Sequence, residues 1–245
     1  MEFWALGTGS GMPSASLDCS SILVRSEDHT FLFDAGEGVT KSLISMGMVP
    51  NELDAVLITH LHPDHVSGIF MLVQMLYLGG RKKPLSLYLP EREEEFEAIF
   101  RIFYTFFEKF SFKLRLLPLA EVNKEFEALT CKENDHLVGY SQIIRRNALP
   151  NRQKAYSLRL QSPGGDFVYS SDLETVDSIA EFCVAAHTIL VDAGHPETTQ
   201  IQKLKDLDIQ RILLTHESRA ETRMWLAENP DPRFEEAVQG AKYII

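Results

Sequence analysis

The chain has 245 residues, 44% of them hydrophobic, and a formal net charge of −11. Its apolar stretches are short and interrupted and its first residues lack a basic segment and a long apolar one, so we expect no transmembrane helix, no signal peptide and a cytoplasmic protein. The acidic charge disfavours nucleic acid as a partner, because tight RNA and DNA binders usually carry a basic face.

Short strand patterns alternate with helical ones along the whole chain. In the first half we expect strands at residues 2–7, 20–26, 30–36, 53–59 and 85–90, and helices at 38–47, 66–80 and 91–110. In the second half we expect strands at 113–119, 126–134, 155–161, 166–172, 188–194 and 211–218, and helices at 173–186, 196–208 and 220–230. This alternation predicts a single α/β domain over residues 1–245, in which two sheets pack together with helices outside.

Two further segments each allow two interpretations, and the cysteines allow one. No acidic residue occurs between His136 and Gly165, and this segment is either a solvated loop followed by a strand or a patch for a phosphorylated substrate; its basic residues are Arg145, Arg146, Arg152, Lys154 and Arg159. The apolar residues 69–78 either pack internally or form the face of a homodimer. The cysteines include no CxxC pair, which predicts reduced thiols; they are Cys19, Cys131 and Cys183.

The stretch "THLHPDHVSG", residues 59–68, concentrates four metal-binding side chains directly after an apolar run. His60 and His62 lie two apart on extended chain, so their rings face the same side. Pro63 suits the first position of a helix, which places Asp64 and His65 at the start of that helix. Imidazole and carboxylate suit Zn²⁺, and also Mn²⁺ or Fe²⁺. This turn alone offers too few ligands for two ions, so a dinuclear site predicts further ligands at later strand ends.

Three later residues meet that requirement. His136, Asp172 and His216 each occur where an expected strand meets a loop, the usual place for the rim of an active site. Taken with the His-x-His-x-Asp-His pattern, they predict a pair of metal ions bound by residues from several strands.

These motifs resemble those of the metallo-β-lactamase-fold hydrolases, and most closely those of the ribonuclease Z and phosphodiesterase branch. The resemblance rests on five stretches that span nearly the whole chain: "GTGSGMPSASLDCSS", "FLFDAGEG", "THLHPDHVSG", "YSSDL" and "LLTHES". It implies a four-layer αββα sandwich with a dinuclear zinc site at one edge.

The same resemblance assigns the ligands, here named by their numbers in this chain. It implies that His60, His62 and His136 hold one ion, that Asp64, His65 and His216 hold the other, and that Asp172 bridges the two. It also implies that Asp34 orients the ligand loop through hydrogen bonds, although an aspartate at this position also suits a turn cap.

We expect a phosphodiesterase that uses a metal-bridging hydroxide on a small phosphodiester. Asp64 is the candidate holder of the nucleophile's proton, and His195 is the candidate general acid, because it follows a strand that should end near the same edge. The sequence agrees equally well with His195 being an exposed histidine in a loop, without a catalytic role.

Three alternatives remain. A tRNA 3′-processing endonuclease of the ribonuclease Z type would use the basic stretch at residues 145–159, but the chain departs from that family: it lacks the basic element near the opening glycines, the glutamate of the His-Glu-Ala-Thr element and the long glycine- and lysine-rich insertion. A non-catalytic metal-binding module would normally have lost a ligand. A flavodiiron-type redox site would carry a carboxylate at the position of His62.

Overall fold

The strands form two sheets in this computed structural model, which describes residues 1–49 and 51–245. The chain divides into two units, and each contains one of the sheets. Unit 1 comprises Met1–Glu121 and Val238–Ile244, and unit 2 comprises Val122–Ala237 together with Ile245. The prediction of one domain over residues 1–245 stays a prediction.

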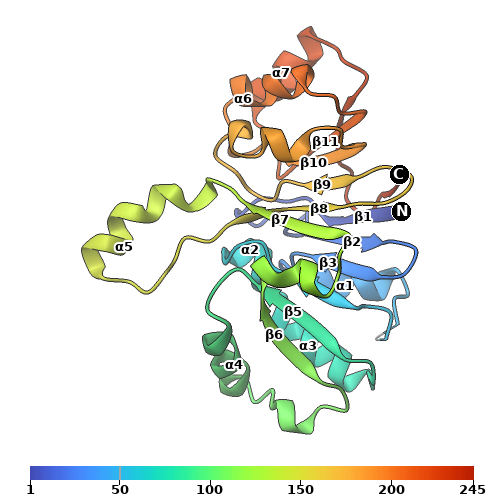
Figure 1. Ribbon diagram of the computed structural model, residues 1–245, viewed down its shortest axis with the longest axis vertical. Coiled ribbons are helices and arrows are strands. Elements are labelled where there is room, and N and C mark those ends of the chain that lie inside the picture. Colours follow the sequence, from blue (N-terminus) through green and yellow to red (C-terminus); the bar gives the residue numbers. More distant parts are fainter. Residues whose placement is uncertain (50) are drawn as a thin grey trace. The chain divides into compact units, whose positions relative to one another are not determined.

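The sheet of unit 1 has the strand order β13–β1–β2–β3–β4–β5–β6 within the described residues, and Figure 1 labels β1, β2, β3, β5 and β6 of this sheet. Its strands are β1 (Glu2–Gly7), β2 (Ser21–Arg25), β3 (Thr30–Phe33), β4 (Ala55–Leu57), β5 (Leu85–Leu89), β6 (Leu114–Pro118) and β13 (Lys242–Ile244). Neighbouring strands are antiparallel from β13 to β3 and parallel from β3 to β6. The parallel strands β4 and β5 are buried along their whole length, which explains their continuous apolar sequences.

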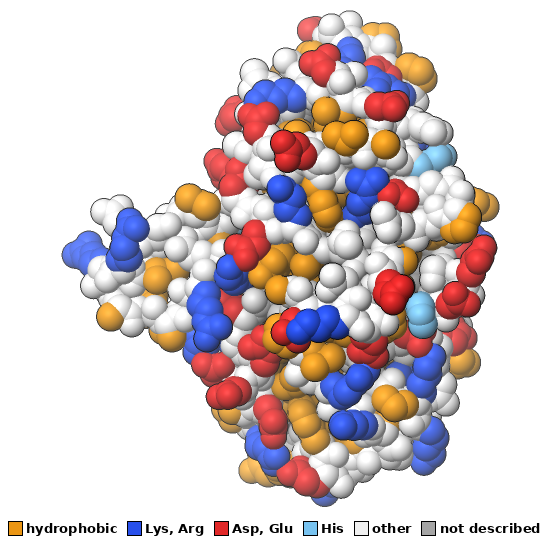
Figure 2. All heavy atoms as spheres, viewed as in Figure 1, with side chains coloured by type: hydrophobic (Ala, Val, Ile, Leu, Met, Phe, Trp, Pro, Cys, Tyr) orange, Lys and Arg blue, Asp and Glu red, His pale blue; other side chains and the backbone are white. Residues whose placement is uncertain are grey.

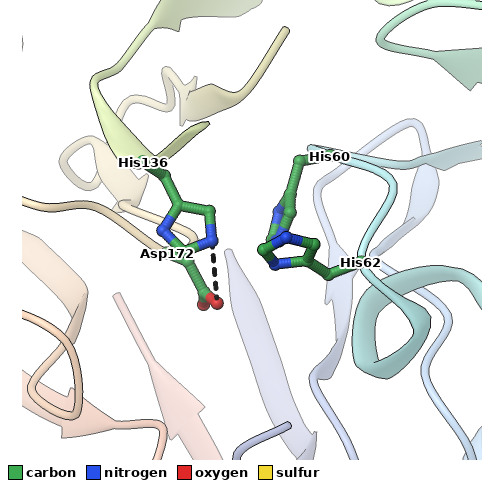
Figure 3. Close-up of side chains that lie close together, drawn as sticks. All are labelled: His60, His62, His136 and Asp172. Atoms are coloured by element: carbon green, nitrogen blue, oxygen red, sulfur yellow. Dashed lines mark ion pairs between the residues drawn. The ribbon is translucent and has the colours of Figure 1, made fainter. Parts of the chain in front are cut away.

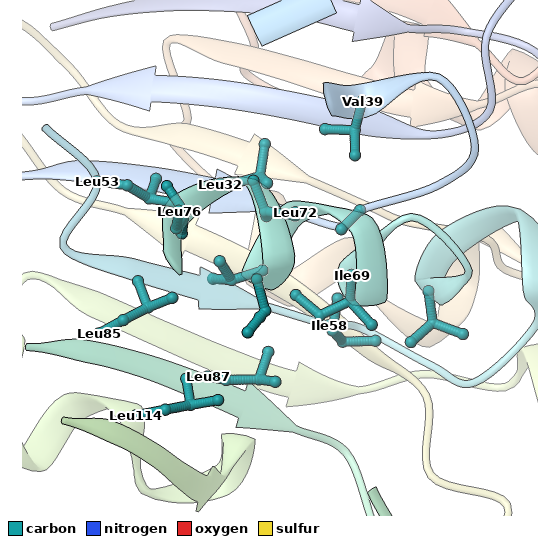
Figure 4. Packing of buried hydrophobic residues seen from close by; sticks show 14 of the residues in the cluster. Leu32, Val39, Leu53, Ile58, Ile69, Leu72, Leu76, Leu85, Leu87 and Leu114 are labelled. Atoms are coloured by element: carbon teal, nitrogen blue, oxygen red, sulfur yellow. The ribbon is translucent and has the colours of Figure 1, made fainter. Parts of the chain in front are cut away.

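The helices of unit 1 cover an apolar core. They are α1 (Val39–Ser45), α2 (Pro63–Val66), α3 (Ile69–Leu78), α4 (Glu93–Ile102), the 3₁₀ turn η1 (Phe107–Lys109) and η2 (Leu119–Lys124), which runs on into unit 2. Helix α3 buries Ile69, Leu72, Val73 and Leu76, whose spacing places them on one helix face, and Figure 4 shows this face against the strands. The same helix leaves Leu78 71% exposed, so α3 packs internally while part of its surface stays apolar.

The helix expected at residues 91–110 is shorter in the structure. It ends at Ile102, and the chain then turns through Tyr104, whose φ is 58°. The acidic first turn and the buried Phe96 and Phe100 agree with the sequence pattern. The prediction failed at the C-terminal end, because Phe107 packs against the core from a separate 3₁₀ turn rather than from the same helix.

The sheet of unit 2 has the order β12–β11–β10–β9–β8–β7 within the described residues. Its strands are β7 (Leu129–Glu133), β8 (Tyr156–Leu160), β9 (Phe167–Tyr169), β10 (Thr188–Asp192), β11 (Arg211–Thr215) and β12 (Phe234–Glu236). Strands β9, β10, β11 and β12 are parallel, and β7 and β8 are antiparallel to their neighbours. The sequence did not predict β12 or β13.

Short helical turns connect these strands. They are η3 (His136–Tyr140), α5 (Ser141–Asn147), η4 (Val176–Ser178), η5 (Ala180–Cys183), α6 (Thr198–Gln202), η6 (Lys203–Asp206) and α7 (Ala220–Glu228). The expected helix at 173–186 is wrong, because two 3₁₀ turns occupy this segment. Its buried residues Leu173, Val176 and Ile179 are three positions apart, which matches the 3₁₀ repeat. The expected helix at 196–208 is split between α6 and η6, and the expected loop after His136 contains α5.

Within the described residues, none of the helices combines the length and apolar character needed to cross a membrane. Cys19, Cys131 and Cys183 are all free thiols.

Candidate metal centre

In unit 1, the turn from β4 to α2 gathers the four residues of the sequence motif. His62 has an extended backbone, with φ −68° and ψ 144°, and Pro63 begins the helix, as expected. The ring centroids of His60 and His62 are 4.7 Å apart, and those of His60 and His65 are 4.1 Å apart (Figure 3 shows His60 and His62). His65 Nε2 lies 3.5 Å from Asp64 Oδ2. We call these four residues the unit 1 half-site.

Asp34 fixes this half-site through hydrogen bonds to the loop and to one of its histidines. Its Oδ1 accepts hydrogen bonds from the backbone N–H of Thr59 at 2.7 Å and from the Thr59 hydroxyl at 2.9 Å. Its Oδ2 lies 2.7 Å from His65 Nδ1, which leaves Nε2 of that ring as the nitrogen available to a metal. The Asp34 side chain is fully buried, so it orients both the loop and the imidazole, as the sequence predicts.

Two glycines and a cysteine lie directly beneath the motif. A Cβ on Gly36 would stand 2.1 Å from the carbonyl oxygen of Asp64, and one on Gly68 would stand 2.3 Å from the carbonyl oxygen of Gly36. The backbone approach therefore requires glycine at both positions. Burial, and then the Asp64 carboxylate, raise the pKa of the neighbouring Cys19 thiol.

In unit 2, three histidine rings surround one carboxylate oxygen. His216 Nε2, His195 Nδ1 and His136 Nε2 lie 3.4, 3.6 and 3.7 Å from Asp172 Oδ2. Figure 3 shows the ion pair between His136 and Asp172. All but His195 are buried, with the side chain of His195 38% exposed. We call His136, Asp172 and His216 the unit 2 half-site.

Parallel strands explain why these residues meet. Asp172 follows β9, Asp192 is the last residue of β10, and His216 follows β11. Because β9, β10 and β11 run parallel, their carboxyl ends share one edge of the sheet, where binding sites of parallel sheets form.

Asp192 lies in the candidate site, and the sequence interpretation did not name it. Its Oδ2 lies 3.0 Å from His195 Nδ1, and its Oδ1 accepts the backbone N–H groups of Gly194 at 2.8 Å and His195 at 3.1 Å. Ligand-type atoms of Asp172, Asp192, His195 and His216 all lie within 4.8 Å of one another. The signal was present in "LVDAGHPE", where an aspartate stands three residues before the candidate acid.

The backbone near these residues adopts uncommon conformations. Ser171 has φ 54° and His216 has φ 65°, both in the left-handed region that costs a non-glycine residue free energy. A Cβ on Gly194 would stand 2.3 Å from the carbonyl oxygen of His216, so close packing supports the His216 turn. Such strain persists only where surrounding contacts hold it, and it is typical of functional sites.

Comparison with known proteins is consistent with this chemistry. The model of the Anti-Pycsar protein Apyc1 family matches residues 1–231. The chain belongs to the Anti-Pycsar protein Apyc1 family.

More distant relatives share most of the chain. It is 25% identical over 262 residues to ribonuclease Z of Methanosarcina mazei, an alignment that covers 86% of this chain and 85% of that protein. The metallo-β-lactamase fold protein YhfI from Bacillus subtilis superposes with a TM-score of 0.76 at 19% identity, covering 99% of this chain and 98% of that one. Human tRNase Z, short form, superposes with a TM-score of 0.74 at 20% identity over the whole of both chains, 100% and 99%.

The family and these relatives confirm the predicted α/β class and the metallo-β-lactamase fold. They also confirm the ribonuclease Z and phosphodiesterase branch of the superfamily, and they identify the chain as a metal-dependent hydrolase. The donor set agrees, because buried imidazole and carboxylate groups are the ligands that divalent ions such as Zn²⁺ take in hydrolases.

The structure also divides the basic stretch after His136. Lys154 forms an ion pair with Glu133, and Arg159 forms one with Asp166 at 2.6 Å. Arg145, Arg146 and Arg152 are exposed on and beside α5, and Figure 2 shows basic side chains next to apolar ones at the outer end of this segment. Two of the five predicted basic groups are therefore neutralised by acidic neighbours in unit 2.

Proposed function

We propose that this chain is a dinuclear phosphodiesterase that hydrolyses small phosphodiesters. The ligands that we propose are His60, His62, Asp64 and His65 in unit 1 and His136, Asp172 and His216 in unit 2. The carrying observation is the arrangement around Asp172, where three histidine nitrogens lie within 3.7 Å of one carboxylate oxygen. Such a cluster of imidazole and carboxylate donors, buried except for His195, suits a bound cation, and zinc is the proposed ion, with Mn²⁺ or Fe²⁺ as alternatives.

Two bound divalent ions would lower the pKa of water and offset the negative charge that develops on the phosphoryl oxygens. The protein residues orient and transfer protons around that chemistry. Asp34 holds the His65 ring by its Nδ1, and Asp64 accepts the proton of the nucleophile.

His195 donates a proton to the leaving alkoxide in this proposal. Asp192 holds its Nδ1, so Nε2 of the partly exposed ring is the nitrogen that faces the substrate. A buried carboxylate that orients an imidazole in this way supports a general-acid role.

Ribonuclease Z-type cleavage of precursor tRNA is the second candidate, and the relatives named ribonuclease Z favour it. A docking surface for RNA would have to use the exposed arginines near α5. Neutralising three phosphates gives a salt slope of only about −3 on a double-logarithmic plot. The net charge of −11 and the ion pairs of Lys154 and Arg159 favour the small substrate instead.

The deciding experiment compares substrates on one metal-analysed sample. We expect about two zinc or manganese ions per chain and metal-dependent turnover of bis(p-nitrophenyl) phosphate and of cyclic mononucleotides, with loss of turnover on chelation and recovery on metal addition. Precursor tRNA should not be cleaved. Cleavage of precursor tRNA that weakens steeply with salt, without turnover of the small diesters, would establish the second candidate instead. A metal-free sample that remains fully active would refute both.

A further inference from the structure

The segment Asn134-Asp135-His136 leads from β7 into η3, and the side chains of Asn134 and Asp135 both form hydrogen bonds to residues near Asp172. The Asn134 amide nitrogen donates to the carbonyl oxygen of Asp172 at 3.0 Å, to that of Ser170 at 3.3 Å and to the Ser157 hydroxyl at 3.1 Å. Its side-chain oxygen accepts the backbone N–H of His136 at 3.2 Å. One side chain thus bonds to the backbones of two proposed ligands.

Asp135 ties the same segment to the residues that follow Asp172. Its Oδ1 accepts the backbone N–H groups of Glu174 at 2.9 Å and Thr175 at 3.1 Å, and its Oδ2 accepts the Thr175 hydroxyl at 2.5 Å. Charge-assisted bonds of this kind are stronger than neutral ones. The backbone on both sides of Asp172 is therefore attached to the residues just before His136.

The attached backbone is strained at Ser171, whose φ of 54° is unfavourable for serine. Ser170, beside it, also accepts the Ser157 hydroxyl at 2.6 Å through its carbonyl oxygen, and its own hydroxyl accepts the backbone N–H of Asp192 at 2.9 Å. Removing the Asn134 amide would leave the strained Ser171 turn with fewer restraints. The carboxylate of Asp172 would then lose its fixed distance from His136 Nε2, now 3.7 Å.

We infer that Asn134, together with Asp135 beside it, positions the proposed ligands: the two side chains link the segment before His136 to the backbone on both sides of Asp172 and thereby set the affinity of unit 2 for its metal ion. This inference rests on the proposed metal-dependent function. Outer hydrogen-bond partners of metal ligands change metal affinity by about 10–100-fold when they are removed. Every contact in the inference lies within unit 2.

The test measures metal binding by the metal-free full chain, so it does not depend on which substrate is hydrolysed. Zn²⁺ affinity is measured by competition with a chromophoric chelator, and the visible spectrum of the Co²⁺ form reports the ligand geometry. For Asn134→Ala we expect affinity about 10–100-fold weaker at one site and an altered Co²⁺ spectrum. The thermal unfolding of the metal-free variant should match that of the control.

The matched control is Gln153→Ala. The Gln153 amide also bonds to η3, at the carbonyl oxygen of Leu137 at 2.7 Å, and its other partners are Val138 and Ser141 rather than His136 or Asp172. It should bind Zn²⁺ as the unaltered chain does. Wild-type affinity in Asn134→Ala, or an equal loss in both variants, would overturn the inference.

A second variant decides the matter if Asn134→Ala does not fold. Thr175→Val removes only the hydroxyl that donates to Asp135 Oδ2, and it should weaken Zn²⁺ binding and alter the Co²⁺ spectrum to a smaller extent. Unchanged binding in Thr175→Val would then overturn the inference. Absence of metal binding in the unaltered chain would refute the proposed function itself, which separates the two failures.

Discussion

At the scale of single residues, the histidines of the site depend on carboxylates behind them. Asp34 Oδ2 lies 2.7 Å from His65 Nδ1, and Asp192 Oδ2 lies 3.0 Å from His195 Nδ1. Each contact occupies Nδ1 of the ring, which leaves Nε2 for the proposed metal ion or substrate, and it restricts rotation of the ring. The first pair belongs to unit 1 and the second to unit 2, so each unit contains a histidine held by a buried carboxylate.

Asp64 provides the sharpest test at this scale. Asp64→Ala should lower phosphodiester turnover by about 10²–10⁴-fold, because it removes both a ligand and the acceptor of the nucleophile's proton. The protein should still unfold cooperatively, because the hydrogen bonds between Asp34 and the loop remain. The exposed Asp28→Ala in the same unit serves as control and should keep full activity. Undiminished turnover in the Asp64 variant would remove its assigned role.

At the scale of elements, close backbone packing places the ligand loop. Gly68 donates its N–H to the carbonyl oxygen of Ala35 at 2.8 Å, which joins the start of α3 to the segment after β3. The Asp64 carbonyl lies over Gly36 in the same layer. The position of the proposed metal ligands is therefore determined partly by residues that carry no side chain.

Gly68→Ala tests this packing. The new methyl group would stand 2.3 Å from the carbonyl oxygen of Gly36 and 2.8 Å from Val39 Cγ1, and the backbone oxygen cannot rotate away. We expect a loss of about 1–3 kcal/mol in the free energy of unfolding, measured in urea, together with weaker Zn²⁺ binding. Gly139→Ala is the control, because a Cβ at Gly139 meets nothing within 4 Å, and it should change stability by less than about 0.5 kcal/mol. Equal stabilities of the two variants would contradict the packing argument.

At the scale of the whole molecule, charge bears on the choice between substrates. The chain is acidic overall, with a net charge of −11, while Arg145, Arg146 and Arg152 are exposed near α5. Long-range attraction of a polyanion such as tRNA depends on such a local surplus of positive charge. A small diester bound by metal ions does not need it.

Charge reversal near α5 tests whether the substrate is a small diester that does not need these arginines. Arg145→Glu, Arg146→Glu and Arg152→Glu together should leave kcat/KM for small phosphodiesters within about twofold, since ordinary surface changes away from a site have little effect. The control carries the same change of charge at the exposed Lys41, Lys82 and Lys113. If only the α5 variant lost small-substrate turnover, these arginines would belong to the substrate site.

The sequence by itself determined the chemistry and most of the strands. Ligand types at short spacing, as in "THLHPDHVSG", and apolar runs such as "AVLIT" depend on local covalent geometry and on burial, which a linear pattern records. The end of α4 at Ile102, the 3₁₀ turns after Asp172 and the strands β12 and β13 did not follow, because packing against distant residues decides them.

Only the tertiary structure revealed the hydrogen bonds of Asp192 and Asn134 near the candidate ligands. It also showed that acidic neighbours neutralise Lys154 and Arg159. The reason is that hydrogen bonds and ion pairs join residues far apart in the chain, such as Asn134 and Asp172, and no local pattern encodes the pairing of strand ends that brings them together.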